Sequence, residues 1–268
     1  MTSRNGASYL SLRMRDRNGG LTGRVFRDAD RIGLRFAAGD AVVVRGRIER
    51  YRGEIVAEID DVRRIEPGDF DPTEFLPAAY RSVEELEGFL EHLIREVHDP
   101  ALRGMVEAVV LTGPDARGFR RAPCTRGGHH AYLGGLLEHT VAVATLVPEV
   151  CVLHPKLDSD LLMAAAIVHD AGKAREFTYG AQFGLSEEGR LLGHLAIGAE
   201  MIGAAAGALP APRRLALLHC VLSHHGSDGG GVRPQSGARG GVGSPEALAL
   251  YRINALDAAV KGALEHGP

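Results

Sequence analysis

Histidine is concentrated in one part of this chain, in short clusters. Nine of the twelve histidines lie between residues 129 and 225, and one of them begins the dipeptide His169-Asp170. Imidazole and carboxylate groups are ligands that divalent transition metals prefer. Histidines that serve only as solvated or packed side chains rarely gather in several short clusters. The pattern therefore predicts a metal site, built mainly from the second half of the chain.

The three cysteines, Cys124, Cys151 and Cys220, are not expected to take part in that metal site. Their number is odd and no two of them form a C-x-x-C pair. They are interpreted as reduced thiols of a cytoplasmic protein rather than as a disulfide framework or a zinc knuckle. No apolar run approaches the length of a membrane span and the N-terminus has no signal-peptide core, so we expect no membrane partner.

The charge of the chain is divided unevenly. Residues 1–66 hold fourteen arginines and ten acidic residues, a net charge of +4, whereas the remainder has a net charge of −7. A basic lobe beside an acidic, histidine-rich lobe suggests a module that grips a polyanion, attached to a metal centre. The alternative is chance variation between two surfaces.

The predicted secondary structure changes near residue 66, where the net charge also changes sign. Residues 9–15, 21–27, 42–49 and 54–59 are typical of short strands, with a glycine-rich turn after the first. We predict a small β-barrel over residues 1–66, similar to an OB-fold, although an OB-fold needs five strands. Such a barrel commonly binds single-stranded nucleic acid. Candidate contacts are three aromatic residues that could stack on bases and three arginines that could hold phosphates: Tyr9, Phe26, Tyr51, Arg13, Arg45 and Arg47. Each aromatic residue could instead pack in the core.

The rest of the chain predicts helices. Residues 67–81 contain three prolines and form a predicted linker, and Ser82 then opens a capping box. Further helices are expected near residues 101–111, 131–147, 159–171, 190–205, 212–223 and 246–265, without strands. The predicted fold is therefore α+β with two domains, a small barrel at 1–66 and a helical domain at 82–268. The glycine-rich loop 226–245 either gates a site or is a surface insertion.

Several motifs resemble those of a known family. His139, His169-Asp170 and Asp257 are similar to the H…HD…D signature of the HD phosphohydrolase superfamily, an all-helical metal-binding fold. Residues 129–140 (HHAYLGGLLEHT) resemble the first motif of the bacterial 3′→5′ exoribonucleases that join an OB-fold to an HD domain, the YhaM type. The motifs at 169–173, 189–194 and 222–226 follow in that family's order. Asn254-Ala255 depart from the family's Asp-Asn, and loop 226–245 is longer than the family's.

The resemblance and the ligand count together imply a pair of ions. One ion would lie on His139, His169 and Asp257, with Asp170 as a bridge. His194, His224 and His225 would hold the second, although His225 could contact substrate phosphate and His194 could support another ligand. This ligand set favours Mn²⁺, with Fe, Co, Ni or Mg as alternatives, and disfavours zinc because no cysteine joins it.

Lys173 and the pair His129-His130 are the candidate catalytic residues. Lys173 follows His169 by one helical turn, so its ammonium could stabilise charge on a transferring phosphoryl group. Its alternative is a surface lysine at a helix C-terminus. His129 and His130 could bind the scissile phosphate or protonate the leaving oxygen, although either could simply pack.

Three functions follow from these observations. The first is a metal-dependent 3′→5′ exonuclease that removes nucleoside monophosphates from single-stranded RNA, with single-stranded DNA as a further candidate substrate. The second is an HD phosphohydrolase that acts on a small nucleotide. The third is a nucleic-acid-binding protein with an inactive HD site. We predict the first, in a cytoplasmic protein with room to form a homo-oligomer.

Overall fold

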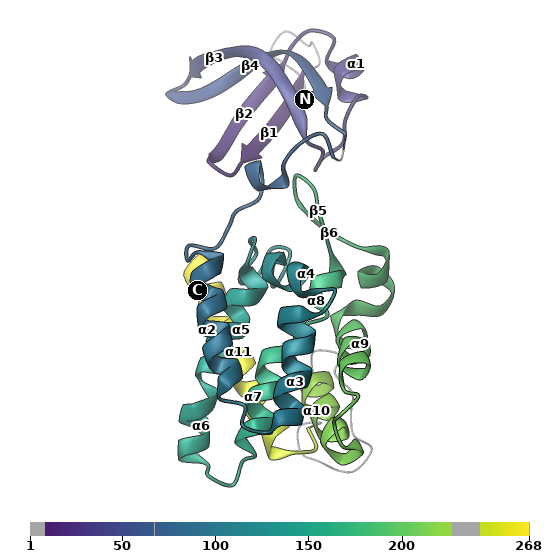
Figure 1. Ribbon diagram of the computed structural model, residues 1–268. Helices are drawn as coiled ribbons and strands as arrows, with labels where there is room; N and C mark the ends of the chain where they lie inside the picture. The colour runs from purple at the N-terminus through teal and green to yellow at the C-terminus, as the bar shows by residue number, and fades with distance from the viewer. Residues whose placement is uncertain (1–8, 67, 227–241, 268) are drawn as a thin grey trace. The chain divides into compact units, whose positions relative to one another are not determined.

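The computed structural model describes residues 9–66, 68–226 and 242–267 (Figure 1). The chain divides into two compact units, one formed by residues 1–77 and 179–184, the other by residues 78–178 and 185–268. The division at residue 77 falls inside the segment 67–81 that the sequence predicts as a linker. Each unit has its own hydrophobic core. The two units are therefore described separately.

The N-terminal unit is a four-stranded sheet in the order β1-β2-β4-β3. Strands β1 (Leu10–Asp16) and β2 (Gly19–Val25) form an antiparallel hairpin, as do β3 (Val42–Tyr51) and β4 (Glu54–Arg64), and β2 pairs with β4 in parallel. A short helix, α1 (Ala29–Gly33), joins the hairpins. The apolar side chains that alternate along the strands, such as Val25, Ile59 and Val62, form the core.

The predicted closed barrel is wrong for the described part of the chain. Strands β1 and β3 stand at opposite ends of the strand order, and no ladder joins them there. A barrel needs its first and last strands to exchange backbone hydrogen bonds, and four strands with this pairing leave both edges open. The unit is a small open sheet.

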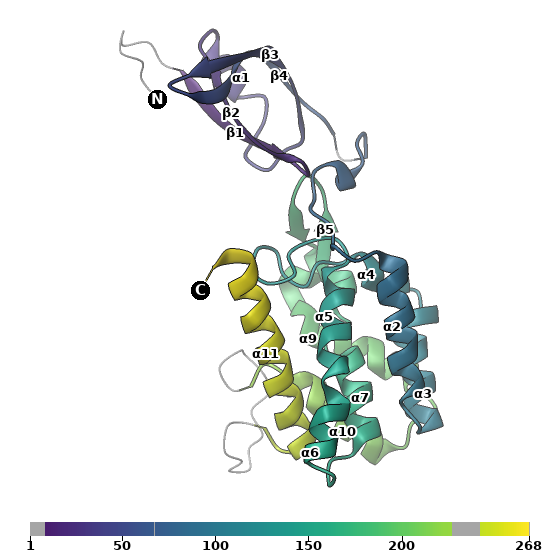
Figure 2. The same ribbon diagram turned by 90° about the vertical axis from the view of Figure 1, so that its left-hand side faces the viewer.

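The C-terminal unit is a bundle of helices, and it contains the predicted HD region. The described elements are a short 3₁₀ turn in the preceding segment (Pro72–Glu74), then α2 (Val83–Arg95), α3 (Pro100–Glu107), a π-helical turn (Ala108–Thr112), α4 (Ala116–Arg121), α5 (Gly135–Thr145), α6 (Val147–Leu153), α7 (Ser159–Val168), α8 (Lys173–Glu176), α9 (Glu187–Ala205), α10 (Ala211–Ser223) and α11 (Pro245–His266). Figure 2 shows α5 and α7 between α11 on one side and α2 and α3 on the other.

Helix α7 is the centre of this bundle. Its residues from Leu161 to Val168 are all buried, and it packs against α2, α3, α5, α10 and α11. A helix that is apolar on every side is stable only inside a protein. The Asp158 carboxylate caps its first turn by accepting from the Leu161 amide at 3.0 Å. The sequence that follows this buried helix, His169-Asp170, is consequently held in the interior.

Two expectations for this region are corrected. A hairpin of β5 (Phe177–Tyr179) and β6 (Phe183–Leu185) lies where only helices were predicted, because strands of three residues are too short to show an alternating pattern. Residues 135–153 are also long and apolar enough to cross a membrane by length and composition, contrary to the expectation that no run approaches that length. That segment comprises α5 and α6, and most of α5 is buried in the core. The predicted loop 226–245 falls mostly outside the described residues.

Candidate metal centre

Helix ends deliver most of the predicted ligands to one place. His169 and Asp170 directly follow α7, and His224 and His225 directly follow α10. His194 follows Gly193, which breaks α9 with φ 69° and ψ 161°, a conformation that glycine adopts without strain. His139 and Asp257 project from the middle of α5 and α11. The backbone thus places histidines from α5, α7, α9 and α10 around Asp170, and Asp257 of α11 contacts His139.

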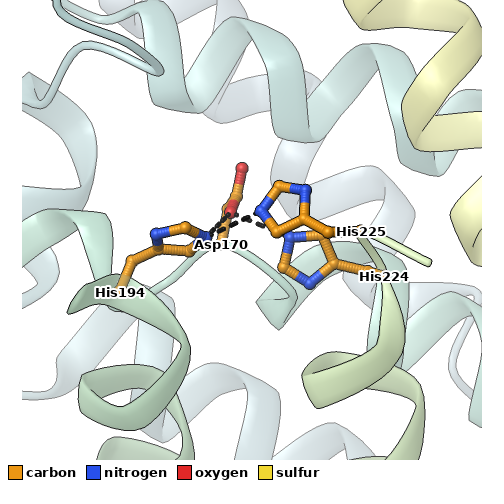
Figure 3. Close-up of side chains that lie close together, drawn as sticks. All are labelled: Asp170, His194, His224 and His225. Atoms are coloured by element: carbon orange, nitrogen blue, oxygen red, sulfur yellow. Dashed lines mark hydrogen bonds and ion pairs between the residues drawn. The ribbon is translucent and has the colours of Figure 1, made fainter. Parts of the chain in front are cut away.

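One cluster consists of Asp170, His194, His224 and His225 (Figure 3). The Nε2 atoms of His194 and His224 lie 3.5 Å and 3.3 Å from Asp170 Oδ1. The Nε2 atom of His225 lies 3.0 Å from that of His194. The ligand atoms of all four side chains are within 4.8 Å of one another. These are the residues predicted for the second ion, together with the predicted bridge.

A second cluster consists of His139, His169 and Asp170. The two Nε2 atoms are 3.2 Å apart, and Asp170 Oδ2 lies 3.6 Å from that of His139 and 3.4 Å from that of His169. Asp170 therefore turns Oδ2 toward this cluster and Oδ1 toward the other. A carboxylate with its two oxygens facing two groups of imidazoles has the geometry of a bridge between two ions.

Hydrogen bonds behind the imidazoles fix which nitrogen faces the centre. The Nδ1–H groups of His169 and His224 donate to the carbonyl oxygens of Ala166 at 2.8 Å and Val221 at 2.6 Å. A carbonyl oxygen only accepts, so Nδ1 carries the proton and Nε2 presents a lone pair. His194 Nδ1 lies 3.3 Å from the Glu176 carboxylate, with the same effect. Among the described atoms, His224 Nε2 and Asp170 Oδ1 are buried without a hydrogen-bond partner.

Burial favours the neutral form of three of these imidazoles. It lowers the pKa of His139 and His225 to about 4 and that of His224 to about 3. Burial opposes ionisation of Asp170, but the neighbouring Lys173 ammonium outweighs this effect and holds the pKa of Asp170 well below its usual range. Neutral imidazoles around an ionised carboxylate are the protonation states that metal binding requires. The lone pairs and the orphaned buried atoms therefore fit divalent cations.

Asp257 lies on the far side of His139. Its Oδ2 atom accepts from His139 Nδ1 at 2.7 Å and lies 3.0 Å from His130 Nε2. It forms a cluster with His130 and His139, and His169 is not part of that cluster. Asn254, where the sequence departs from the family pattern, donates to the His224 carbonyl at 3.3 Å. Both α11 residues thus hold histidine ligands in place.

The three candidate catalytic residues lie beside these clusters. Lys173 is buried and donates to Asp170 Oδ2 at 2.7 Å. Burial opposes its charge, but Asp170 and Cys124 outweigh that effect and raise the pKa of Lys173. The rings of His129 and His130 lie 5.3 Å and 5.4 Å from that of His139. Because Lys173 is buried, the alternative that it is a surface residue is wrong.

Two further residues of the centre were not predicted. Cys124 Sγ lies 3.8 Å from Asp170 Oδ2 and accepts from Lys173 at 3.4 Å, so a cysteine does reach the centre. Glu176 accepts from both the backbone and the ring of His194. Neither residue belongs to a spacing that marks metal ligands in sequence. Only the folding of α4, α8 and α9 brings them here.

The predicted nucleic-acid contacts all lie in the sheet unit. Phe26 and Tyr51 are about half exposed, and Arg13, Arg45 and Arg47 are exposed on strands β1 and β3. The Arg24 guanidinium covers the Tyr51 ring at 4.4 Å. The rings of Tyr9 and Phe26 lie 5.8 Å apart. The sheet therefore presents arginines and aromatic rings together.

Two comparisons with known proteins find similarities that cover this centre. Residues 136–259 match the HD domain, a span that begins before His139 and ends after Asp257. The chain is similar to a 3′-5′ exoribonuclease YhaM of Listeria welshimeri, with 29% identity over 97% of this chain and 81% of the relative. No solved structure matches.

Proposed function

We propose that this chain is a member of the YhaM-type family of HD-domain proteins and a metal-dependent 3′→5′ exoribonuclease that releases nucleoside monophosphates from single-stranded RNA. The observation that carries the proposal is Asp170, whose two oxygens face two separate groups of imidazoles. A phosphodiester carries anionic oxygens that repel an attacking nucleophile. Sites that hydrolyse it therefore concentrate positive charge, and this one is shaped to hold two cations.

The proposed ligands follow the two clusters. His139, His169 and Asp170 would hold one ion, and Asp170, His194, His224 and His225 would hold the other. Asp257, named as a ligand from sequence, would orient His139 through its Nδ1–H. Such a pair of ions polarises the phosphoryl group, activates water and stabilises the leaving oxygen. Histidine and carboxylate ligands favour Mn²⁺ or Fe²⁺.

Protein side chains supply the remaining functions. Lys173 keeps Asp170 ionised and places a fixed positive charge beside the scissile group. The rings of His129 and His130 lie 5.3 Å and 5.4 Å from that of His139, where they would contact the substrate phosphate. Glu176 orients His194 so that its Nε2 atom faces the centre.

The basic sheet would hold the RNA strand. Tyr51 beneath the Arg24 guanidinium offers a stacking surface for a base, and the exposed arginines offer phosphate contacts. This arrangement favours a polymer over a small nucleotide as substrate. Single-stranded DNA would bind the same groups, since neither stacking nor phosphate contacts need a 2′-hydroxyl. The three free thiols fit a cytoplasmic location.

Digestion of a 5′-labelled single-stranded RNA tests the proposal. With Mn²⁺ the protein should produce a descending ladder that ends in short oligonucleotides, with nucleoside monophosphates as the other product. Asp170→Ala should lower the rate by on the order of 10³-fold, since several kcal/mol of metal-dependent stabilisation disappear. An untouched strand, together with hydrolysis of small nucleotides, would instead establish the second function. Equal activity of Asp170→Ala would show that the metal centre is not the active site.

A further inference from the structure

A cysteine thiol is built into the wall of the metal centre. Cys124 is buried, and its backbone amide donates to the carbonyl of His130 at 3.0 Å. Thr125 Oγ1 donates to the carbonyl of His129 at 2.9 Å and accepts from the Gly128 amide at 2.8 Å. These bonds close the loop from 124 to 130. The loop therefore holds Cys124 and His129 on the same side of His139.

Glycine allows helix α5 to approach this loop. A Cβ atom at Gly135 would lie 2.1 Å from the His130 carbonyl oxygen and 3.2 Å from the Cys124 amide nitrogen. Any larger residue would push the start of α5 away from the loop. Since His139 lies one turn further along α5, Gly135 sets the spacing between His139 and the other two side chains.

The ligand atoms of Cys124, His129 and His139 lie within 4.8 Å of one another. His129 Nδ1 is buried and has no hydrogen-bond partner among the described residues. Of the three side chains, His129 alone has a buried nitrogen without a partner, and it lies beside a thiol and a second imidazole that can both bind a cation.

We propose that Cys124, His129 and His139 form a third cation site, which shares His139 with the cluster of His169 and Asp170 and is selective for a thiophilic divalent ion such as Zn²⁺. A four-coordinate zinc ion lies about 2.3 Å from sulfur and about 2.0 Å from nitrogen, which separates its ligand atoms by roughly 3.5 Å. The fourth position stays open for water or a phosphate oxygen.

Binding at this site releases a proton. Cys124 is buried, and burial disfavours the charged thiolate, so the thiol keeps its proton until a cation binds. The incoming cation forms a bond to sulfur while the S–H bond breaks, and the proton passes to solvent. No electron is transferred, so the step needs no oxidant or reductant.

His139 belongs to this site and to the cluster with His169. Its Nδ1–H donates to Asp257, which leaves one lone pair, on Nε2. One lone pair binds one ion, so zinc at the cysteine site and an ion at the His169 cluster exclude each other. If the chain is the nuclease proposed above, Zn²⁺ should inhibit the Mn²⁺-loaded enzyme by capturing His139. This is the only consequence of the zinc site that rests on the proposed function.

Cobalt substitution tests the site without an activity assay. Co²⁺ replaces Zn²⁺ and gives a sulfur-to-cobalt charge-transfer absorption only when a thiolate is bound. The full-length protein titrated with Co²⁺ should show this absorption, and Zn²⁺ should abolish it. Cys124→Ser should lack it. Cys220→Ser is the matched control, because Cys220 is also buried with its pKa raised to about 12, and it should keep the absorption.

A second variant addresses the histidine. His129→Gln leaves the thiol intact and should weaken Co²⁺ binding at the sulfur site at least tenfold. Loss of a residue that only hydrogen-bonds to a metal ligand already weakens binding by about that factor. No charge-transfer absorption in the wild type at saturating Co²⁺, or an unchanged absorption in Cys124→Ser, would overturn the proposal. RNA hydrolysis in the presence of Mn²⁺ is measured separately, so failure of the nuclease function leaves this result interpretable.

Discussion

Asp170 and Lys173 form a buried ion pair on which the centre depends. Asp170 is 1% exposed and Lys173 is 5% exposed, and their charged atoms lie 2.7 Å apart. A buried carboxylate without a cation is strongly destabilising. Lys173 therefore supplies in the metal-free protein the positive charge that bound ions would add.

Replacing Lys173 should show whether its ammonium neutralises Asp170 when no metal ion is bound. Lys173→Met should destabilise the metal-free protein by about 3–5 kcal/mol, because Asp170 is left buried and unpaired. The loss should be smaller with Mn²⁺, since the ions neutralise the carboxylate. Urea unfolding with and without Mn²⁺ measures both values. Lys261→Met is the control, because Lys261 pairs with Glu138 at a more exposed position and should cost about 1 kcal/mol or less. A loss of equal size with and without Mn²⁺ would contradict this role of Lys173.

At the residue level, the sequence predicts candidate ligands better than the residues that support them. His139, His169, Asp170, His194, His224 and His225 stand in short motifs, so their types and spacing mark them as candidates. Cys124 and Glu176 carry no such mark, because their importance arises from contacts across the fold. The expectation that cysteine is absent from the centre was wrong for this reason.

Among the elements, α9 depends most on a single backbone conformation. Gly193 has φ 69° and ψ 161°, in a region that other residues enter only at a cost of about 1–3 kcal/mol. Gly193→Ala should therefore shift His194 and lower the affinity for the second ion, while most of the bundle stays folded. Manganese titration followed by electron paramagnetic resonance measures the loss.

Gly203 provides the comparison for this variant. It lies in the same helix, has no positive φ, and has open space where a Cβ atom would project. Gly203→Ala should leave metal binding unchanged and stabilise the helix by up to about 1 kcal/mol. Equal metal affinity of the two variants would show that the kink at Gly193 does not set the position of His194.

The sheet should determine affinity for RNA through Tyr51. Tyr51→Ala should weaken binding of single-stranded RNA by about 1–3 kcal/mol, the value of one stacked base, at constant salt. Hydrolysis of a small phosphodiester should be unchanged, because the metal centre is intact. Tyr80→Ala, which removes a fully exposed tyrosine outside the sheet, is the control. Equal effects of both variants on RNA affinity, measured by fluorescence anisotropy, would exclude a specific role for Tyr51.

Long elements could be predicted from sequence and short ones could not. Helix α7 is recognisable because its apolar residues form one uninterrupted run, and α2 because Ser82 begins a capping box. The three-residue strands β5 and β6 are too short for a periodic signal. Sheet closure was predicted wrongly because alternation within a strand does not determine which strands pair.

For the whole molecule, the buried histidines link stability to pH. An unfolded histidine has a pKa of about 6.5, whereas burial lowers that of His139 to about 4 and that of His224 to about 3. Between these values the unfolded chain binds protons that the folded chain does not. Stability of the metal-free protein should therefore fall as the pH drops below 6.5, by about 2 kcal/mol for each of these histidines at pH 5.

Urea unfolding of the metal-free protein at pH 7 and pH 5 measures this dependence. His224→Gln removes one of the titrating groups, so the variant should lose less stability than the wild type over the same interval. Stability that rises toward pH 5 would contradict the assignment of neutral buried imidazoles.

The metal content of the purified chain tests the central claim most directly. After reconstitution with Mn²⁺ and removal of free ions, elemental analysis should find two ions per chain. His225→Ala should retain about one, because it removes a ligand only from the cluster of Asp170, His194, His224 and His225, and Asp170→Ala should retain neither, because it removes the residue that both clusters share. No bound manganese in the wild type, or two ions in Asp170→Ala, would contradict a binuclear centre built on Asp170.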